Sequence, residues 1–226
     1  KKRAKRKRRI RRRIGYVFKL LAMPIYFAPS IFVFGTRFRF LVCTFPDRIG
    51  HLAAEFDCFL KEMDLGRRPT IRPVSLLSRE EVANPCLLQY WESRIRIIHN
   101  RLLRWLLKPF LYFPYLRISL FKMVAVANET GSYPSVLATW GTRAPLLSLT
   151  PEHVKRGEEG LRELGVPEDA WFVCVHSREG GYSPHDEHVH AYRNSPIGDY
   201  VLAMEAIVEQ GGCCIRMGDS TMAPLP

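Results

Sequence analysis

The chain has 226 residues, 47% of them hydrophobic, which is enough for one large domain or two small domains with a sizeable core. The formal net charge of +12 is concentrated at one end, because residues 1–13 contain eleven Lys or Arg and no acidic residue. The remainder has 23 basic and 22 acidic residues, which argues against a nucleic-acid-binding face on the globular part. We therefore expect no specific nucleic-acid partner. Salt-sensitive nucleic-acid binding by the tail alone is the remaining alternative.

An apolar, aromatic segment follows the basic tail. Residues 14–35 carry a single charge, and their uncharged part, residues 20–36, has 17 residues, near the lower limit for a spanning helix. A polybasic run beside an apolar segment suits the anionic cytoplasmic leaflet of a membrane. We predict that residues 1–36 lie on or dip into the membrane from its cytoplasmic side, as a peripheral or monotopic segment. The alternative is a disordered basic tail in front of a buried element.

The six cysteines form no CxxC pair and show no regular spacing. We therefore expect reduced and mostly buried thiols. Reduced thiols favour the cytoplasm over an oxidising compartment, which agrees with a protein on the cytoplasmic side of a membrane.

The first half is predicted to begin with a strand, a loop and a helix. Residues 39–44 (RFLVCT) form a short apolar run typical of a buried strand. From Leu52 onward, apolar positions recur at helical spacing until Gly66 ends the pattern. Residues 73–77 are a second possible strand. This succession favours a Rossmann-like half.

The loop of this unit, residues 45–51, carries the candidate catalytic residues. Gly50 at the helix start allows a ligand to approach the backbone, and His51 beside it titrates near neutral pH. We predict His51 or Asp47 as a general base. The alternative is that His51 is an ordinary surface residue at a helix start.

Two longer segments complete this half. One helix over residues 85–107 is predicted from the spacing of Trp91, Ile95, Ile98, Leu102 and Trp105. Its arginines fall largely on other positions, so the helix would either pack in the core with a solvated basic face or lie against a membrane. Residues 128–142 are dense in Gly, Ser, Thr and Pro and predict a loop.

The second half is predicted to form a βαβ unit. Thr150-Pro151 is typical of a helix start, with threonine as the N-cap. Residues 171–175 then predict a strand, which a Gly- and His-rich loop, a helix and a second strand ending at Arg216 follow. Such units have a right-handed crossover and bind their ligand at the carboxyl ends of the strands. The polar residues at those ends are His176, Arg178, Arg216, Gly218 and Asp219.

Arginines are expected to converge at these strand ends. Arg193-Asn194 is placed just before the predicted helix, where backbone N–H groups and the helix dipole favour an anion. Together with Arg178 and Arg216, Arg193 would neutralise a phosphate-like group without a metal.

Four motifs carry a resemblance to a known family. They are V-C-x-H-x-R-x-x-G-Y at 173–182, Y-R-N-S-x-I-x-x-Y at 192–200, G-G-x-x-I-R-M-G-D-x-x-M-x-P-L at 211–225 and R-I-G-H-L-A-x-E at 48–55. In combination they resemble a largely uncharacterised bacterial glycosyltransferase family of surface-polysaccharide biosynthesis. The His176-x-Arg178 element is also similar, more distantly, to the H-x-R of O-fucosyltransferase-like enzymes. There the arginine contacts the donor diphosphate, which implies the same role for Arg178.

The resemblance implies an α/β fold of the GT-B type with two Rossmann-like halves. Residues 37–150 would form the acceptor side and residues 151–226 the donor side, behind the membrane-associating residues 1–36. The second half is expected to be incomplete, because the chain ends a few residues past its second strand.

The implied reaction transfers a sugar from a nucleotide-sugar to a polysaccharide or lipid-linked acceptor in cell-surface glycan biosynthesis. It needs no cofactor, since the nucleotide-sugar is the donor substrate. The predicted donor-binding residues are His176, Arg178, Arg193, Asn194, Arg216, Gly218 and Asp219.

Two alternatives stand beside this interpretation. A histidine cluster could bind zinc, although it lacks a known metal signature; it comprises His185, Asp186, Glu187, His188 and His190. The chain could also be a non-enzymatic, membrane-associated interaction protein or an inactive glycosyltransferase remnant. A nucleotide-binding measurement separates the glycosyltransferase from the interaction protein or remnant, because a remnant would bind no nucleotide.

Overall fold

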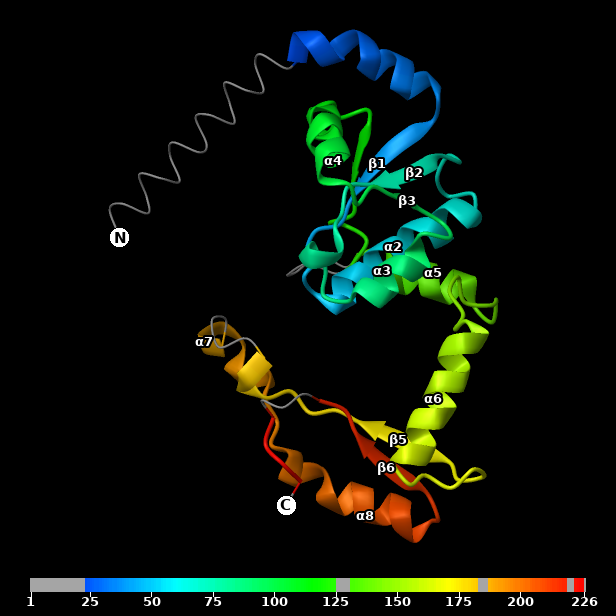
Figure 1. Ribbon diagram of the computed structural model, residues 1–226, viewed down its shortest axis with the longest axis vertical. Coiled ribbons are helices and arrows are strands. Elements are labelled where there is room, and N and C mark those ends of the chain that lie inside the picture. Colours follow the sequence, from blue (N-terminus) through cyan, green and yellow to red (C-terminus); the bar gives the residue numbers. More distant parts are fainter. Residues whose placement is uncertain (1–22, 125–130, 183–186, 219–221, 226) are drawn as a thin grey trace, which may run out of the picture. The chain divides into compact units, whose positions relative to one another are not determined.

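The computed structural model describes residues 23–124, 131–182, 187–218 and 222–225 (Figure 1). The chain divides into two compact units, Lys1–Ser148 and Leu149–Pro226. Each unit combines helices with its own sheet of parallel strands, so the predicted α/β class is confirmed.

Four parallel strands form the sheet of the first unit. Their bounds are Phe38–Val42 for β1, Arg72–Ser75 for β2, Arg96–Ile97 for β3 and Arg117–Ser119 for β4. The strand order is β3-β2-β1-β4, and Phe40 in β1 pairs with Val74 of β2 and Arg117 of β4. This order matches the first four strands of a doubly wound sheet of the Rossmann type. The first unit is therefore compatible with a Rossmann-like half.

Helices cover both faces of this sheet (Figure 1). On one face lie α2, α3 and α5, which span Ile49–Asp64, Pro85–Trp91 and Tyr133–Trp140. On the other lie the helical residues 23–35, α4 and η2, the last two spanning Arg101–Leu107 and Lys108–Tyr112.

Successive side chains of β1 contribute to two apolar cores, one on each face of the sheet. Leu41 belongs to the cluster under α2, α3 and α5, whereas its neighbour Phe40 packs with Phe110 and Leu116 on the opposite face. Successive side chains of a strand point to opposite faces, so one strand serves both layers. Burying each large apolar side chain stabilises the fold by about 1.5–3 kcal/mol.

The predicted helix after the first strand is confirmed as α2. It begins at Ile49, and its apolar positions Leu52, Phe56 and Leu60 are fully buried. Gly66, just past its end, has a φ of 72°, a left-handed conformation that glycine adopts without a Cβ clash. The spacing and the terminating glycine were therefore sufficient to define this element.

The single helix predicted over residues 85–107 is wrong. The segment, which follows η1 (Arg79–Glu81), forms α3, the short strand β3 and then α4. Ile95, just before β3, is 1% exposed, and β3 pairs with β2 at the sheet edge. The Asn100 side chain accepts the Leu103 N–H and starts α4 as a new helix. Pairing with a neighbouring strand outweighed the helical spacing.

The loop predicted over residues 128–142 is also wrong in part, because α5 occupies most of its second half. Val136 and Trp140, four residues apart, are buried, and α5 packs on α2. Proline is tolerated in the first turn of a helix, and Gly141 ends this one with a φ of 58°. The Gly, Ser, Thr and Pro content of this segment is typical of loops, yet part of it folds as a short helix with one buried face.

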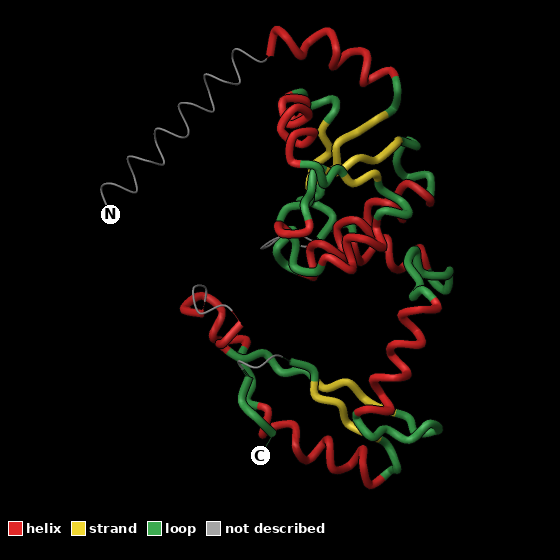
Figure 2. Tube along the Cα trace, in the orientation of Figure 1, coloured by secondary structure: helices red, strands yellow, loops and turns green. Residues whose placement is uncertain are grey.

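The second unit has the predicted βαβ arrangement. Figure 2 shows its two strands side by side, and they pair in parallel. In chain order the unit contains α6 (Pro151–Glu163), β5 (Phe172–Val175), α8 (Val201–Glu209) and β6 (Cys213–Arg216). The described residues of the loop between β5 and α8 include the short helices η3 (Gly180–Tyr182), α7 (Glu187–His190), η4 (Ala191–Arg193) and η5 (Ile197–Tyr200). As expected, the Thr150 hydroxyl accepts a hydrogen bond from the His153 N–H at the start of α6.

Arg193-Asn194 precedes the helix less directly than predicted. Arg193 ends η4, and η5 intervenes before α8 begins at Val201. Because η5 runs directly into α8, the first N–H groups of this helical run belong to η5, which begins three residues after Asn194.

The described part of the chain contains no helix with the length and apolar character that crossing a bilayer requires. Residues 23–35 of the predicted membrane-associating segment are helical, and residues 1–22 lie outside the described residues.

All six cysteines are free thiols, as predicted, but most of them are not buried. Cys43 and Cys58 are buried, whereas Cys86 and Cys174 are exposed. Burial, reinforced by Glu62, raises the pKa of Cys58 to about 12. Cys174 is exposed because β5 belongs to a two-stranded sheet, which leaves part of its surface uncovered.

Candidate functional site

A buried carboxylate holds His51 in the first turn of α2. Glu55, one turn later, is fully buried, and its Oε1 lies 2.8 Å from His51 Nδ1. The other oxygen accepts the backbone N–H of Thr44 at 2.7 Å. An ionised carboxylate only accepts hydrogen bonds, so Nδ1 is the donor in this pair, and in the neutral imidazole Nε2 is then the nitrogen with the free lone pair. The ring is thereby oriented with a free base atom.

This histidine–carboxylate pair lies where the strand order of the first sheet reverses. Thr44 follows β1, and at the end of the adjacent β4 the Leu120 N–H donates to the Val42 carbonyl at 3.1 Å. Open parallel sheets bind ligands outside the carboxyl ends of their strands at such a switch point. The pair therefore occupies the position at which this fold favours a ligand.

The rest of the predicted loop is arranged unevenly around His51. The Phe45 ring stands edge-on to the imidazole with 5.0 Å between centroids, and the Arg48 guanidinium lies over Phe45. A Cβ built on Gly50 would meet no atom within 4 Å, so the helix start is open there. Asp47 is exposed, and its side chain makes no hydrogen bond or ion pair with the described residues. Of the two predicted bases, the structure orients His51.

Glu55 is a residue to which the sequence analysis assigned no role. Its signal is the i,i+4 spacing from His51, which places the two side chains on one helix face. Burial and the Glu55 carboxylate together raise the pKa of the neighbouring Cys43 thiol. A raised pKa disfavours the reactive thiolate, so Cys43 is a poor candidate for a nucleophile at this site.

The strand ends of the second unit come together as predicted. Val175 and Arg216 are register partners at the carboxyl ends of β5 and β6, and the Met217 N–H donates to the Val175 carbonyl at 2.8 Å. His176 Nδ1 lies 3.2 Å from the Met217 carbonyl. The two predicted donor-side loops thus leave the sheet side by side.

Arg178 is the centre of a polar cluster in the loop after β5. Its guanidinium donates to the His190 carbonyl at 2.9 Å and to the side-chain oxygen of Asn194, and it faces Glu187 at 3.6 Å. The Asn194 amide nitrogen in turn donates to Glu187. A Cβ on Gly180 would come within 2.9 Å of the Glu187 carboxyl carbon, so the glycine makes room for this cluster.

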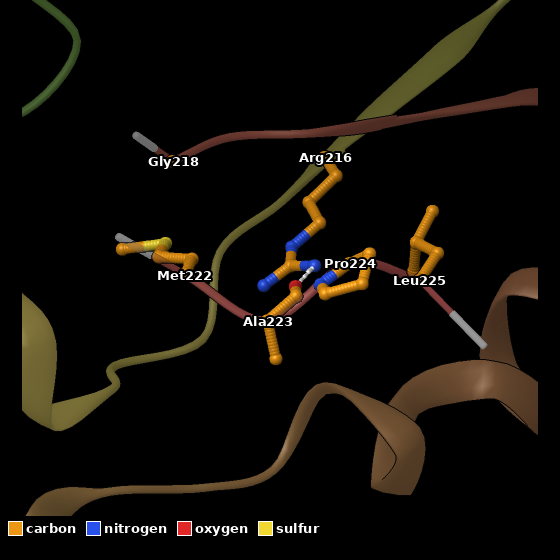
Figure 3. Close-up of a pocket in the computed structure, with 6 residues that line it drawn as sticks. All are labelled: Arg216, Gly218, Met222, Ala223, Pro224 and Leu225. Atoms are coloured by element: carbon orange, nitrogen blue, oxygen red, sulfur yellow. Dashed lines mark hydrogen bonds between the residues drawn. The ribbon is translucent and has the colours of Figure 1, made fainter. Parts of the chain in front are cut away.

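Arg216 forms a second, neighbouring cluster. It pairs with Glu179 at 2.8 Å and donates to the Ala223 carbonyl, while Glu179 also accepts the Ala223 N–H at 2.7 Å. Figure 3 shows the Arg216 guanidinium pointing toward the Ala223 carbonyl. These residues line an open pocket of about 330 Å³. Its lining residues are Arg216, Gly218, Met222, Ala223, Pro224 and Leu225.

Arg178 and Glu179 are consecutive residues, so the clusters of Arg178 and Arg216 are joined through the backbone. Arg193 is exposed and makes no hydrogen bond or ion pair with the described residues. The structure therefore brings Arg178, Arg216 and Asn194 into linked clusters and leaves Arg193 outside them. Asp219, also predicted at this edge, lies outside the described residues.

Both clustered arginines already face a carboxylate. Their side chains are largely covered, with exposed fractions of 24% for Arg178 and 14% for Arg216. A guanidinium has five N–H donors, more than these partners occupy, so each arginine can still donate to an anion. A bound diphosphate would compete with Glu187 and Glu179 for some of these N–H donors.

The zinc alternative falls partly outside the described residues, because His185 and Asp186 lie there. Across the part of the chain that the structure describes, no three His, Cys, Asp or Glu side chains form a group that could hold a metal ion. Glu187 faces Arg178 instead.

Comparison with known protein families, with curated proteins and with solved structures gives no match to this chain.

Proposed function

We propose that this chain is a glycosyltransferase of the GT-B type that moves a sugar from a nucleotide-sugar to a polysaccharide or lipid-linked acceptor. The observation that carries the proposal is the His51–Glu55 pair, in which a fully buried carboxylate orients a histidine at the switch point of a parallel sheet. The motif resemblance and the arginine clusters after β5 and β6 support it. The first unit would serve the acceptor and the second unit the donor.

In the proposed reaction, His51 Nε2 removes the proton from an acceptor hydroxyl. The acceptor oxygen forms its bond to the anomeric carbon, and the bond from that carbon to the diphosphate oxygen breaks. Glu55 stabilises the imidazolium that forms, as carboxylates do in histidine-based catalysis. The negative charge develops on the departing nucleoside diphosphate.

Arg178 and Arg216 are the proposed ligands of that diphosphate. Guanidinium groups bind phosphate oxygens through paired N–H donors and stabilise developing charge without a metal. His176, Asn194, Gly218 and Asp219 remain predicted donor contacts, and Arg193 would contribute only by turning its exposed side chain toward the ligand. The pairing of both arginines with carboxylates of their own unit favours one rival, in which they serve only structure.

Calorimetry with UDP, GDP, CDP, dTDP and ADP tests the proposal on the full chain. We expect one of these to bind, and Arg178→Ala to weaken that binding about tenfold to a hundredfold, because a hydrogen bond to a charged group contributes about 1.5–3 kcal/mol. Arg162→Ala, an exposed arginine on α6, is the matched control and should leave affinity unchanged.

Two outcomes contradict the assignment. Binding of no nucleotide would favour the non-enzymatic interaction protein or inactive remnant. Equal affinity in wild type and Arg178→Ala would remove Arg178 from the donor site, and a lower melting temperature of the same variant would then show that the arginine serves the fold.

A further inference from the structure

Two elements on one face of the first sheet expose large apolar side chains. In the helical residues 23–35, Phe32 is 76% exposed and Ile25 is 73% exposed. In α4, Leu102 is 63% exposed and Trp105 is 58% exposed, and α4 buries none of its residues. Large apolar side chains exposed on neighbouring elements are typical of a binding surface.

Aromatic contacts hold the two elements on a common base. The Tyr26 ring packs edge-on against Phe110 of η2 at 5.1 Å, and Phe34 packs edge-on against Tyr115 at 5.5 Å. The buried Ser30 hydroxyl is hydrogen-bonded to the Tyr115 hydroxyl. Residues 23–35 and α4, which continues directly into η2, therefore both pack on the same buried cluster and belong to one layer.

The two sequence stretches that contain this layer carry only basic charged residues. The sequence contains no acidic residue before Asp47 and none between Ser93 and Asn128. Two cations of the second stretch, Arg94 and Arg104, pair with carboxylates from elsewhere in the unit. Arg101, the first residue of α4, and Lys108, just past its end, are exposed and make no ion pair with the described residues.

We propose that residues 23–35 and α4 together form a docking surface for an anionic lipid bilayer. Apolar side chains, Trp105 among them, would enter the boundary between headgroups and acyl chains, and Arg101 and Lys108 would contact lipid phosphates. A second copy of the chain is disfavoured as the occupant, because it would place these cations against one another. Helix α4 lies outside residues 1–36, so it is a membrane contact that the basic tail does not provide. The inference does not depend on sugar transfer.

Flotation with vesicles tests the surface on the full chain. We expect binding to phosphatidylcholine vesicles that contain phosphatidylglycerol and much weaker binding to phosphatidylcholine alone. Leu102→Glu should lower the partition coefficient about tenfold or more, because an apolar side chain leaves the bilayer and an anion approaches its surface. Leu202→Glu is the matched control, since Leu202 is a leucine of α8 that is 79% exposed. Both leucines are exposed, so circular dichroism should show both variants folded.

The depth of Trp105 in the bilayer distinguishes docking of α4 from attachment by the basic tail alone. Phospholipids brominated in their acyl chains should quench part of the tryptophan fluorescence, and Trp105→Phe should remove that quenching. Trp171→Phe, which alters an exposed tryptophan of the second unit, should leave the quenching in place.

Three results would overturn the proposal. Vesicle binding without quenching at Trp105 would mean that the tail alone attaches the protein. Equal partitioning of Leu102→Glu and Leu202→Glu would exclude α4 from the contact. If the protein self-associates without lipid and Leu102→Glu abolishes that self-association, the surface is instead an interface between copies of the chain.

Discussion

Glu55 is a buried residue that connects two elements of the first unit. Its carboxylate joins the end of β1, through the Thr44 N–H, to the ring of His51 on α2. Burying a charge is costly unless its hydrogen bonds are made, and these two contacts supply them. The same contacts give the proposed base its orientation, so structure and the proposed chemistry depend on one side chain.

His51→Ala should lower turnover about 10²–10⁴-fold, the usual contribution of a positioned general base, while nucleotide affinity stays the same. Glu55→Gln should also lower kcat with little change in donor affinity, because the amide cannot satisfy the Thr44 N–H and His51 as the carboxylate does. Turnover would be followed as nucleoside diphosphate released from UDP-glucose, UDP-N-acetylglucosamine and GDP-fucose.

A second histidine–carboxylate pair provides the control. His99 Nε2 lies 2.8 Å from Glu92 Oε1, the same separation as in the His51–Glu55 pair, but both partners are about one-third exposed. His99→Ala should therefore leave turnover unchanged. Loss of kcat in both alanine variants would point to a general effect of histidine removal and against a base role for His51.

At the scale of elements, β3 changes the interpretation of an apparently helical segment. The apolar spacing of residues 91–105 satisfies a helix, yet Ile95 and β3 are used at the sheet edge. Helix propensity is a weak prior, and a parallel strand partner with a buried apolar residue outweighs it. As a result α4 is a short, separate helix whose apolar side chains stay exposed.

Because α4 buries no residue, its N-cap should matter for its stability. The Asn100 side-chain oxygen accepts the Leu103 N–H at 3.0 Å. Asn100→Ala should lower the free energy of unfolding by about 1 kcal/mol, the usual cost of losing a cap. Urea denaturation measures this, and Asn100→Ser, which keeps an acceptor, should restore most of the loss. Equal midpoints for wild type and the alanine variant would show that α4 is frayed at this end.

At the scale of the whole molecule, the two units have unequal cores. The first unit buries two apolar clusters, one on each face of its sheet. In the described part of the second unit, Ile197 and Met204 are the buried apolar side chains, while Phe172 and Val208 are exposed. Apolar burial is the dominant favourable term in folding, so the two sheets should differ in local stability.

Hydrogen exchange followed by mass spectrometry should show this difference. Amides of β5 and β6 are expected to exchange faster than those of β1 and β2, since opening the two-stranded sheet exposes less apolar surface. Both sheets are parallel and belong to the same chain, so solution conditions cancel in the comparison. Equal protection in the two sheets would mean that the second unit has stabilising contacts beyond those of its described residues.

The sequence was a good guide to the βαβ unit and to the residue types at its strand ends, but not to their partners. Arg178 and Arg216 were expected at the ends of β5 and β6, and they lie there. Their pairing with Glu187 and Glu179 was not predicted, because a contact between residues distant in the chain leaves no local pattern. Arg193 was expected to join them from a helix start that instead lies later, at Val201.

Residue order by itself determined the elements whose signals are local: the strand β1, the helix α2 with its terminating Gly66, and the start of α6 at Thr150. These depend on periodicity, capping and glycine conformation within a few residues. Tertiary structure decided that β3 is a strand, that Glu55 is buried against His51, and that α4 remains exposed. The physical reason is that strand pairing, burial and ion pairing depend on residues that only the folded chain brings together.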